Sequence, residues 1–527
     1  MPSKSERSLV FHPFFFAIYA VLGVYSQNSI EVPAQWVIRP MLVLLLLVCV
    51  VYYIVQRKTQ DSQYTGLVVT LSLFWFFFGH FHRALLENSP FWNTLPGVFL
   101  AVILWTAPLV FLGSKWAWNH IKNRRLVTSF LNLTSIFVVL FPAYLTAGSI
   151  LQTVRQTRIY EAQRATHAPV TLTASQATPD IYLIILDAYG REDFLREVYG
   201  FDNHGFVAAL ERRDFYVADQ SAANYPQTYL SISSLLNMQY LDAFARDLQT
   251  TSNRGPVINL LQQSDVRRSL QMAGYDFVAL PSASLSTQIR DADVYVNMTV
   301  GDLNEFEGLL LSSTFANFAI DALQLNVPVP SYRLHRQYIL YSLEQLEAMA
   351  NVTSPKFVFA HIMAPHPPFV LDEKGKPVQP DRPFNTGDAS GFMGTPEEYI
   401  RGYTGEISYL NERMTQVIDS ILANSKQPPI IIIQGDHGPG NYFNMIESDN
   451  TCLKERYSIL NAYYFPDHDY AALYPGITPI NSFRVVFNQY FGTNLELLED
   501  KSYYATWLAP YVFSDVSDEI EFCEIAR

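Results

Sequence analysis

The chain contains 527 residues, more than one hydrophobic core normally organises, so it is expected to fold as at least two regions. Its formal net charge is −13, but residues 1–125 carry ten Lys and Arg against four Asp and Glu, a net charge of +6, which leaves −19 on the remainder. This acidic remainder argues against nucleic acid as a partner, because phosphate backbones are bound through Lys and Arg.

Five apolar stretches follow one another in the first third of the chain, and each is close to the roughly 20 residues that a membrane-spanning helix needs. Buried helices of a soluble domain are a poor explanation for so many such runs in succession. A cleaved signal peptide is also a poor explanation, because further apolar stretches follow the first. We therefore predict an all-α transmembrane region of five helices, at residues 8–24, 36–55, 64–80, 94–113 and 127–150.

The positions of Lys and Arg orient these helices in the membrane. Cations precede the first stretch and occupy the loops after the second and fourth, whereas the loops at 27–35 and 83–92 are almost free of them. By the positive-inside rule the amino terminus is cytoplasmic, and an odd number of spans places everything after residue 150 outside. The sequence thus predicts an integral protein of the inner or plasma membrane with three parts. These are a transmembrane region at 1–150, a linker or juxtamembrane segment at 151–179, and an extracytoplasmic catalytic domain at 180–527.

Beyond the linker, short strand-like segments alternate with helix-like segments. This alternation predicts an α/β domain with a mostly parallel, doubly wound central sheet that has helices on both faces. Strands are expected at 181–186, 215–218, 275–280, 357–362, 430–434 and 462–465, and helices at 205–212, 228–237, 264–273, 338–350 and 397–424. The stretch at 365–395, rich in Pro and Gly, is expected to form a loop over the edge of the sheet.

Two of the predicted strands end at acidic residues. The apolar run at 181–186 is followed by Asp187, and the run at 430–434 is followed by Gly435, Asp436 and His437. Both runs are β-branched and apolar, as is typical of strands buried inside a parallel sheet. Ligands of open α/β sheets bind outside the carboxyl ends of such strands. We therefore predict that Asp187, Asp436 and His437 converge on one edge of the sheet and bind a cation.

Thr228 is expected in the first turn of the helix that follows Pro226. A hydroxyl there faces unpaired backbone N–H groups at the positive end of the helix dipole, which favours an anionic substrate. An alternative interpretation gives Thr228 only an N-cap role. Together with Asp187, Asp436 and His437, however, Thr228 completes a set of three oxygen ligands and one nitrogen ligand. That set suits one divalent ion, Mn, Zn or Mg, which would activate the Thr228 hydroxyl as a nucleophile.

These residues resemble the sulfatase-like branch of the alkaline phosphatase superfamily. The resemblance rests on Asp187 ending the first strand, Thr228 at a helix start, and the segment at 435–438 ending a late strand. Five spans before such a domain look like the layout of lipoteichoic acid synthases and phosphoethanolamine transferases. The resemblance implies an alkaline-phosphatase-like fold, with a Thr that is phosphorylated as a covalent intermediate beside a metal. The chain departs from the hydrolytic sulfatases around Thr228, because no Cys or Ser stands there before a Pro and an Arg for conversion to formylglycine, which weighs against sulfate-ester hydrolysis.

Two histidines and one arginine are further candidates for substrate binding. His366 resembles the Pro-His-x-Pro histidine with which sulfatase relatives contact the oxyanion of the substrate, so we assign it to binding or to protonation of the leaving group. His361 lies on an apolar strand, where a hydrogen-bonded core role is the alternative. The two histidines could contribute to a second metal site, but no further Asp-His set completes one. Arg191 could clamp a phosphate in bidentate fashion or pair with Glu192 or Asp193.

The chain has three cysteines. Cys49 lies in the second apolar stretch, which leaves Cys452 and Cys523 in the exterior domain. An oxidising compartment would permit one disulfide between these two, but the sequence does not decide whether they meet.

The sequence favours a membrane-anchored, metal-dependent enzyme that transfers or cleaves a phosphoryl-linked group of a phospholipid or envelope glycan through Thr228. One alternative is a hydrolase of sulfate or phosphate monoesters. Another is a lipid-sensing or regulatory domain that keeps the fold without the chemistry. The expected partners are the membrane and the lipid or glycan substrate, with no obligate protein partner.

Overall fold

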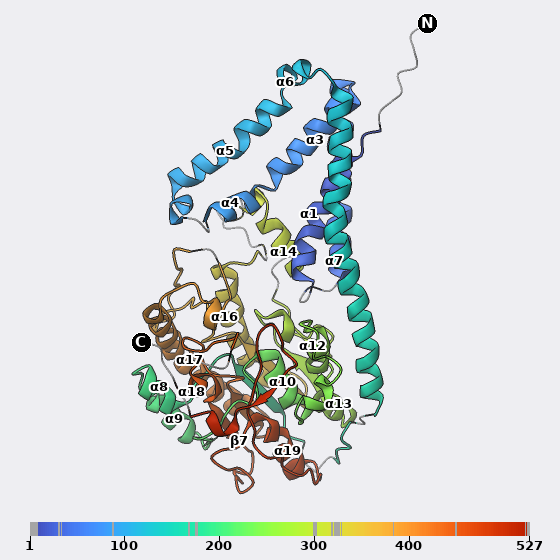
Figure 1. Cartoon of the computed structure of the whole chain (residues 1–527). Coiled ribbons are helices and arrows are strands. Elements are labelled where there is room, and N and C mark those ends of the chain that lie inside the picture. The colour runs from blue at the N-terminus through green and yellow to red at the C-terminus, as the bar shows by residue number, and fades with distance from the viewer. Residues whose placement is uncertain are drawn as a thin grey trace. The chain divides into compact units, whose positions relative to one another are not determined.

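The computed structural model of the protein describes residues 9–29, 32, 34–86, 89–166, 169–173, 178–298, 303–317, 320, 327, 329–382, 384–447, 451–521 and 523. The chain forms two compact units, whose elements are labelled in Figure 1. The first unit comprises Met1–Arg155, Thr299–Ser331 and Pro380–Pro383, and the second comprises Gln156–Met298, Tyr332–Gln379 and Phe384–Arg527.

All of the regular secondary structure in the described residues of the first unit is helical. Its helices are α1 (His12–Asn28), α2 (Ile38–Thr59), α3 (Ser62–Phe76), α4 (Phe78–Leu86), α5 (Leu95–Gly113), α6 (Lys115–His120), most of α7 (Arg124–Thr166) and α14 (Glu305–Ser312), with the 3-10 turns η1 (Ala34–Val37) and η2 (Pro90–Asn93).

Three helices of the described chain are long and apolar enough to cross a membrane, namely Ala34–Thr59, Pro96–Gly113 and Arg124–Gln152. Helices also form at the first and third predicted stretches, but α1 has 17 residues and α3 has 15. The third stretch is divided because Phe77 leaves the helical conformation, with φ −86° and ψ 43°, before α4 begins. Three apolar helices are therefore shown, and five spans are not confirmed.

A seven-stranded sheet organises the second unit, with the strand order β2-β7-β6-β1-β5-β3-β4. Its strands are β1 (Ile181–Leu186), β2 (Tyr216–Val217), β3 (Asp276–Ala279), β4 (Val294–Tyr295), β5 (Lys356–Ile362), β6 (Ile430–Gln434) and β7 (Asn461–Tyr464). Every pairing is parallel except those of β7, which is antiparallel to both of its neighbours. The prediction of a mostly parallel central sheet is confirmed. A separate pair, β8 (Tyr503–Tyr504) and β9 (Ser514–Asp515), was not predicted.

Helices of the second unit cover both faces of this sheet. They are α8 (Glu192–Val198), α9 (His204–Glu211), α10 (Thr228–Asn237), α11 (Asp242–Ala245), α12 (Gly255–Gln262), α13 (Asp265–Met272), α16 (Tyr332–Ala348), α17 (Pro396–Asn424), α18 (Leu453–Tyr457) and α19 (Pro479–Tyr490). Short 3-10 turns also occur, at η3 (Leu285–Thr287), η4 (Met349–Asn351), η5 (Ala389–Gly391) and η6 (Ser517–Glu519).

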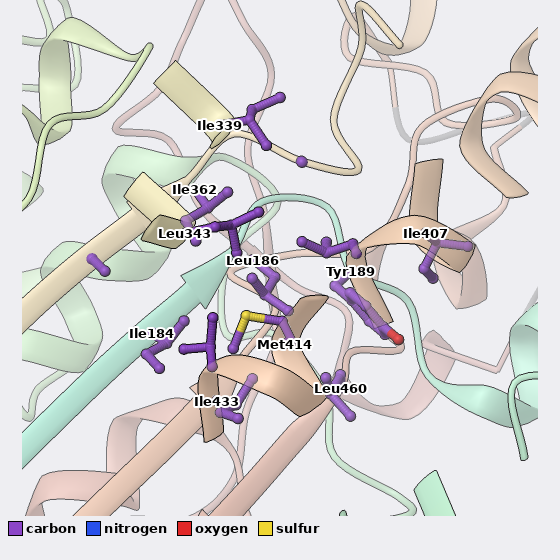
Figure 2. Packing of buried hydrophobic residues seen from close by; sticks show 14 of the residues in the cluster. Ile184, Leu186, Tyr189, Ile339, Leu343, Ile362, Ile407, Met414, Ile433 and Leu460 are labelled. Atoms are coloured by element: carbon purple, nitrogen blue, oxygen red, sulfur yellow. The ribbon is translucent and has the colours of Figure 1, made fainter. Parts of the chain in front are cut away.

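Alternate side chains of β1 enter two different hydrophobic cores. Ile184 and Leu186 lie in one core with residues of α16 and α17, and Figure 2 shows them beside Leu343 and Met414 of those helices. Leu183 and its alternate neighbours lie in the other core, with residues of α10, α13 and α19. Burying one Ile or Leu side chain stabilises the fold by about 1.5–3 kcal/mol. A shift of β1 by one residue would exchange the side chains that face the two cores and disrupt both. The cores therefore fix the register of β1 and the position of the residue that follows it.

Residues 303–317 lie with the helices of the first unit, although the chain reaches them from β4 and returns to α16. Helix α14 begins with a capping box in which Asn304 accepts the N–H of Glu307 at 2.9 Å. Phe306 is fully buried and lies edge-on to Tyr25, with 6.0 Å between ring centroids. Glu307 also accepts hydrogen bonds from Arg39. The apolar helices therefore hold a segment that the sequence places between β4 and α16 of the second unit.

The structure joins Cys452 and Cys523 in a disulfide, which decides the pairing that the sequence left open. The two cysteines are 71 residues apart in the chain, so the bond restricts a long loop of the unfolded state. Replacing both with Ser is expected to lower the free energy of unfolding by about 2–4 kcal/mol. Thermal unfolding of the purified full chain in detergent measures this loss. Cys49→Ser, which removes the free cysteine, is the control, and an unchanged melting temperature in the double variant would contradict the expectation.

Candidate metal-binding active site

The carboxyl ends of β1 and β6 bring three of the predicted metal ligands together. The two strands are parallel neighbours, with Ile185 level with Gln434, so Asp187 and Asp436 emerge at the same edge of the sheet. Ligand atoms of Asp187, Asp436 and His437 all lie within 4.8 Å of one another. His437 Nε2 is 3.6 Å from Asp187 Oδ1 and 3.4 Å from Asp436 Oδ2. All three side chains are buried.

The donor atoms of this cluster suit a divalent cation. Asp187 Oδ1 and Asp436 Oδ2 are buried and have no hydrogen-bond partner among the described residues. Two such carboxylate oxygens close together are costly to bury unless a cation lies between them. The other oxygen of Asp436 accepts the N–H of Ala188 at 3.2 Å, which orients the carboxylate. His437 Nδ1 lies 3.0 Å from the carbonyl oxygen of Gly438, so Nδ1 donates and the lone pair of Nε2 is directed to the cluster.

The charge states of the cluster also favour metal binding. Burial disfavours the charged form of Asp187, but His366, His361 and His437 outweigh burial and hold the pKa of Asp187 below its usual range. Burial, together with the guanidinium of Arg456, lowers the pKa of His437. Near neutral pH the cluster therefore offers an ionised carboxylate and a neutral imidazole, the forms in which these groups bind metals.

Thr228 lies beside the same cluster. Its Oγ1 is 3.2 Å from His437 Nε2, and it is only partly buried although its neighbours in α10 are buried. The N-cap of α10 is Gln227, so Thr228 is the first helical residue and the N-cap interpretation of Thr228 is wrong. Ser231, one turn further on, donates to the carbonyl oxygen of Asp436 at 2.6 Å and fixes the helix start against the end of β6.

The two predicted histidines lie at the same edge in different roles. His361 Nε2 is 3.3 Å from Asp187 Oδ2, and its Nδ1 contacts the hydroxyls of Thr287 and Ser282 at 2.8 and 3.1 Å. His361 therefore faces the Asp187 carboxylate with Nε2 while its other ring nitrogen is held by two hydroxyls. His366 Nδ1 lies 2.6 Å from the carbonyl oxygen of Pro367, and its ring centroid is 6.4 Å from that of His437. The Nδ1 of His366 is therefore committed to this carbonyl oxygen.

A protein-family profile named Sulfatase matches residues 180–483, more than half of the chain. The chain belongs to the sulfatase family. The matched region includes every predicted site residue, and it confirms the resemblance to the sulfatase-like branch of the alkaline phosphatase superfamily. A search of curated proteins gave no significant match.

Solved structures similar to this sulfatase-family chain include transferases and sulfatases. The C-terminal periplasmic domain of EcEptC from Escherichia coli is 13% identical, and the alignment covers 67% of this chain and 98% of that one with a TM-score of 0.44. The integral membrane lipooligosaccharide phosphoethanolamine transferase EptA from Neisseria meningitidis is 12% identical, with 91% and 95% covered and a TM-score of 0.38. BT1596, a 2-O GAG sulfatase, is 11% identical, with 61% and 72% covered and a TM-score of 0.40. None of these similarities is close enough to assign a substrate.

Arg191 does not join the metal cluster of the sulfatase-family domain. Its Nε and Nη2 donate to the two carboxylate oxygens of Asp193 at 2.7 and 2.8 Å, and its Nη1 donates to the carbonyl oxygen of Ser221 at 2.9 Å. The structure therefore shows the pairing with Asp193 that the sequence left open, in a buried rather than a surface position. A guanidinium committed in this way does not serve as the predicted phosphate clamp.

The sequence analysis missed three buried residues around this site. Arg456, from α18, lies 3.2 Å from His437 Nε2 and 2.6 Å from Asp388 Oδ2. His335, from α16, is buried, and its pKa is lowered to about 3 by burial and by the nearby His366. No motif marks any of the three, because Arg456 follows Lys and Glu as in an exposed helix and Asp388 lies in the aperiodic stretch at 365–395.

The loop that carries His366 is held by a buried carboxyl group. Glu406 of α17 accepts the backbone N–H groups of Val370 and Leu371 at 3.0 and 3.2 Å. Glu406 is fully buried, and burial raises its pKa from 4.5 to about 8. Since the folded state keeps a proton that the unfolded state has lost, this group makes stability fall as the pH rises from about 4.5 to about 8.

Glu406→Gln is expected to remove this dependence. At pH 5 the variant and the wild type should melt at similar temperatures, because the protonated carboxyl and the amide are alike in shape. At pH 8.5 the variant should be the more stable by about 1–3 kcal/mol. Thermal melts across this pH range measure the difference, with Glu412→Gln on the exposed side of α17 as the control. A difference that does not grow with pH would contradict the expectation.

Proposed function

We propose that this protein transfers or cleaves a phosphoryl-linked group of a membrane phospholipid or envelope glycan, with Thr228 as the nucleophile and one divalent ion, Mn, Zn or Mg, as cofactor. The observation that carries the proposal is the position of the Thr228 hydroxyl, 3.2 Å from a nitrogen of the buried Asp187, Asp436 and His437 cluster. A purely structural role for Thr228 would not explain why its hydroxyl contacts a cluster in which two carboxylate oxygens lack hydrogen-bond partners among the described residues.

Asp187, Asp436, His437 and Thr228 would hold the cation. A divalent cation bound there supplies positive charge that makes the Thr228 hydroxyl easier to ionise and stabilises negative charge on the phosphoryl oxygens. Asp187 is kept in place by His361, and Asp436 by the Ala188 N–H, so the ligands are organised before the substrate arrives. Thr228 is placed beside them by the start of α10, where Ser231 donates to the carbonyl oxygen of Asp436.

The reaction proposed for Thr228 has two steps. First, Oγ1 bonds to phosphorus as its proton leaves to solvent, and the bond from phosphorus to the leaving oxygen breaks with protonation by His366. Second, an acceptor alcohol or water bonds to the same phosphorus, its proton passes to His366, and the bond from phosphorus to Thr228 Oγ1 breaks as Oγ1 takes up a proton from solvent. His366 fits this exchange because its Nδ1 is fixed on the carbonyl oxygen of Pro367, which leaves Nε2 to give and take the proton.

The membrane setting supports a lipid or envelope substrate. The three apolar helices are accompanied by α1 and α3 at the other two predicted stretches, and we propose that all five stretches cross the membrane. The cation pattern then puts the amino terminus in the cytoplasm and the domain from residue 180 onward outside, after the linker at 151–179. The disulfide between Cys452 and Cys523 is consistent with an oxidising compartment.

Product analysis tests the reaction class. Purified full chain, loaded with Mn or Zn, is incubated with vesicles containing phosphatidylethanolamine and phosphatidylglycerol, with and without an alcohol acceptor. We expect diacylglycerol in both cases, with the head-group phosphate on the alcohol when the acceptor is present and free when it is absent. Activity only on phosphate or sulfate monoesters would overturn the proposal in favour of a monoester hydrolase. No turnover by metal-loaded protein on any of these substrates would favour the regulatory alternative.

A further inference from the structure

A buried arginine lies directly against the proposed metal ligands. Arg456 is 2% exposed, and its Nη2 is 3.2 Å from Nε2 of His437. The imidazole has one lone pair on Nε2, which cannot both bind a cation and accept an N–H. When His437 binds a metal through Nε2, the Nη2 donors of Arg456 therefore require another acceptor at the same place.

The rest of the guanidinium is fixed by groups outside the cluster. Nε donates to the carbonyl oxygen of Pro226 at 2.8 Å, and Nη1 donates to Asp388 Oδ2 at 2.6 Å and to the carbonyl oxygen of Gly438 at 3.1 Å. The guanidinium also lies over the ring of Phe443, 5.2 Å from its centroid. Asp388 is held in turn by the hydroxyl of Tyr399, which donates to Oδ1 at 2.8 Å. Nη2 is thus the nitrogen that these contacts direct at the cluster.

The distances allow one phosphoryl group to reach both Thr228 and Arg456. Thr228 Oγ1 and Arg456 Nη2 each lie 3.2 Å from His437 Nε2, so they are at most 6.4 Å apart, twice that distance. An attack distance of about 3–3.5 Å followed by a hydrogen bond of about 2.9 Å spans such a gap. A phosphoryl group in line for attack by Thr228 is therefore within reach of Arg456 through a non-bridging oxygen.

The charges around the cluster fit this arrangement. Leaving the histidines aside, the carboxylates of Asp187, Asp436 and Asp388 and the guanidinium of Arg456 carry formal charges that sum to −2. A divalent cation makes this set neutral, so an anionic phosphoryl group enters without net repulsion. Arg456 then supplies a second positive centre beside the phosphorus, at a site where the described residues form one metal-ligand cluster.

We propose that Arg456 is a catalytic residue that donates from Nη2 to a non-bridging phosphoryl oxygen and stabilises its charge in the transition state, with Asp388 as the residue that positions it. This inference rests on the proposed phosphoryl chemistry at Thr228. It adds a protein group whose effect is strongest when charge moves onto the oxygen.

The test compares Arg456→Gln, Arg456→Lys and Asp388→Asn in the full chain. The matched control is Arg267→Gln, because Arg267 is also buried, pairs with Asp291 at 3.0 Å and lies over the Phe277 ring, but belongs to α13 outside the site. Three quantities are measured for each protein: kcat/KM on the chromogenic diester bis(4-nitrophenyl) phosphate, bound metal per chain, and the rise in melting temperature caused by inorganic phosphate.

We expect Arg456→Gln to keep its metal, to lose about 10²–10³-fold in kcat/KM, and to lose the phosphate-induced rise in melting temperature. Arg456→Lys should recover part of the kcat/KM and part of the phosphate-induced rise in melting temperature, because lysine restores the positive charge but not the paired N–H donors of the guanidinium. Asp388→Asn should lose about tenfold in kcat/KM. The Arg267→Gln control should retain wild-type values of kcat/KM and of the phosphate response.

Retention of both wild-type kcat/KM and the wild-type phosphate response by Arg456→Gln would overturn the inference. Loss of bound metal in Arg456→Gln, with activity restored by added metal, would also overturn it, because the role would then be structural. If Arg456→Gln does not fold, the kcat/KM and the phosphate response of Arg456→Lys are compared with those of the wild type in its place, and wild-type values of both would overturn the inference. The phosphate measurement does not require Thr228. Full turnover by Thr228→Ala would therefore overturn the proposed function, and the effect of Arg456→Gln on the phosphate-induced rise in melting temperature would still test the role of Arg456.

Discussion

Thr228→Ala is expected to lower turnover by about 10⁴–10⁶-fold, the loss seen when an enzyme is deprived of its covalent nucleophile. The physical reason is that the variant lacks the oxygen that attacks phosphorus, and no other described hydroxyl is placed as Thr228 Oγ1 is, 3.2 Å from His437 Nε2. Steady-state kinetics on bis(4-nitrophenyl) phosphate measures the loss. Bound metal is measured in the same samples, because Thr228 is also a proposed ligand.

Rapid acid quench of the wild type should trap the phosphorylated form of Thr228, which mass spectrometry of the intact chain and of its peptides identifies. Thr228→Ser is the control, since it keeps the hydroxyl and should keep both the adduct and a measurable part of the turnover. Wild-type turnover by Thr228→Ala, or an adduct on a different residue, would show that the nucleophile has been misassigned. An adduct-free wild type with full activity would instead indicate direct attack by water.

The elements nearest the site could be predicted because their sequences are locally unambiguous. The apolar runs that became β1 and β6 are each about as long as one buried strand, and helix α10 spans the predicted residues 228–237. The convergence of Asp187 and Asp436 followed from one rule about the carboxyl ends of parallel strands. The count of spans was less certain, because apolarity alone did not show that Phe77 would interrupt the third stretch.

The surroundings of the cluster could not be predicted, because they depend on contacts between distant parts of the chain. Arg456 meets Asp388 from 68 residues away and Pro226 from 230 residues away. Arg191 shows the converse problem, since its sequence position allowed two partners and only the folded structure reveals that Asp193 occupies its donors. Residue type and spacing therefore predicted that Asp187, Asp436 and His437 lie together, whereas the groups that surround them required coordinates.

Asp436→Asn is expected to be more stable than the wild type without metal, and to lose this advantage when metal is bound. In metal-free wild type, the ionised carboxylates of Asp187 and Asp436 are buried close together with one oxygen of each lacking a hydrogen-bond partner, so they repel each other. The variant removes one of these charges at nearly constant shape and should melt above the wild type in a chelator. With metal at about 100 times its dissociation constant, the wild type gains about 2.7 kcal/mol, and the variant should gain far less because it has lost a charged ligand.

Melting curves of both proteins in EDTA and in Mn or Zn measure this reversal, and metal analysis reports occupancy. Asp419→Asn is the matched control, because Asp419 is half exposed and pairs with Arg213 instead of belonging to the cluster. Turnover should fall with occupancy, since the same cation that offsets the carboxylates also activates Thr228. Equal stabilisation of wild type and Asp436→Asn by metal would mean that the cation binds elsewhere. If Asp436→Asn were no more stable than the wild type in EDTA, the two buried carboxylates would not repel each other. The electrostatic reason for a metal at this edge of the sheet would then be lost.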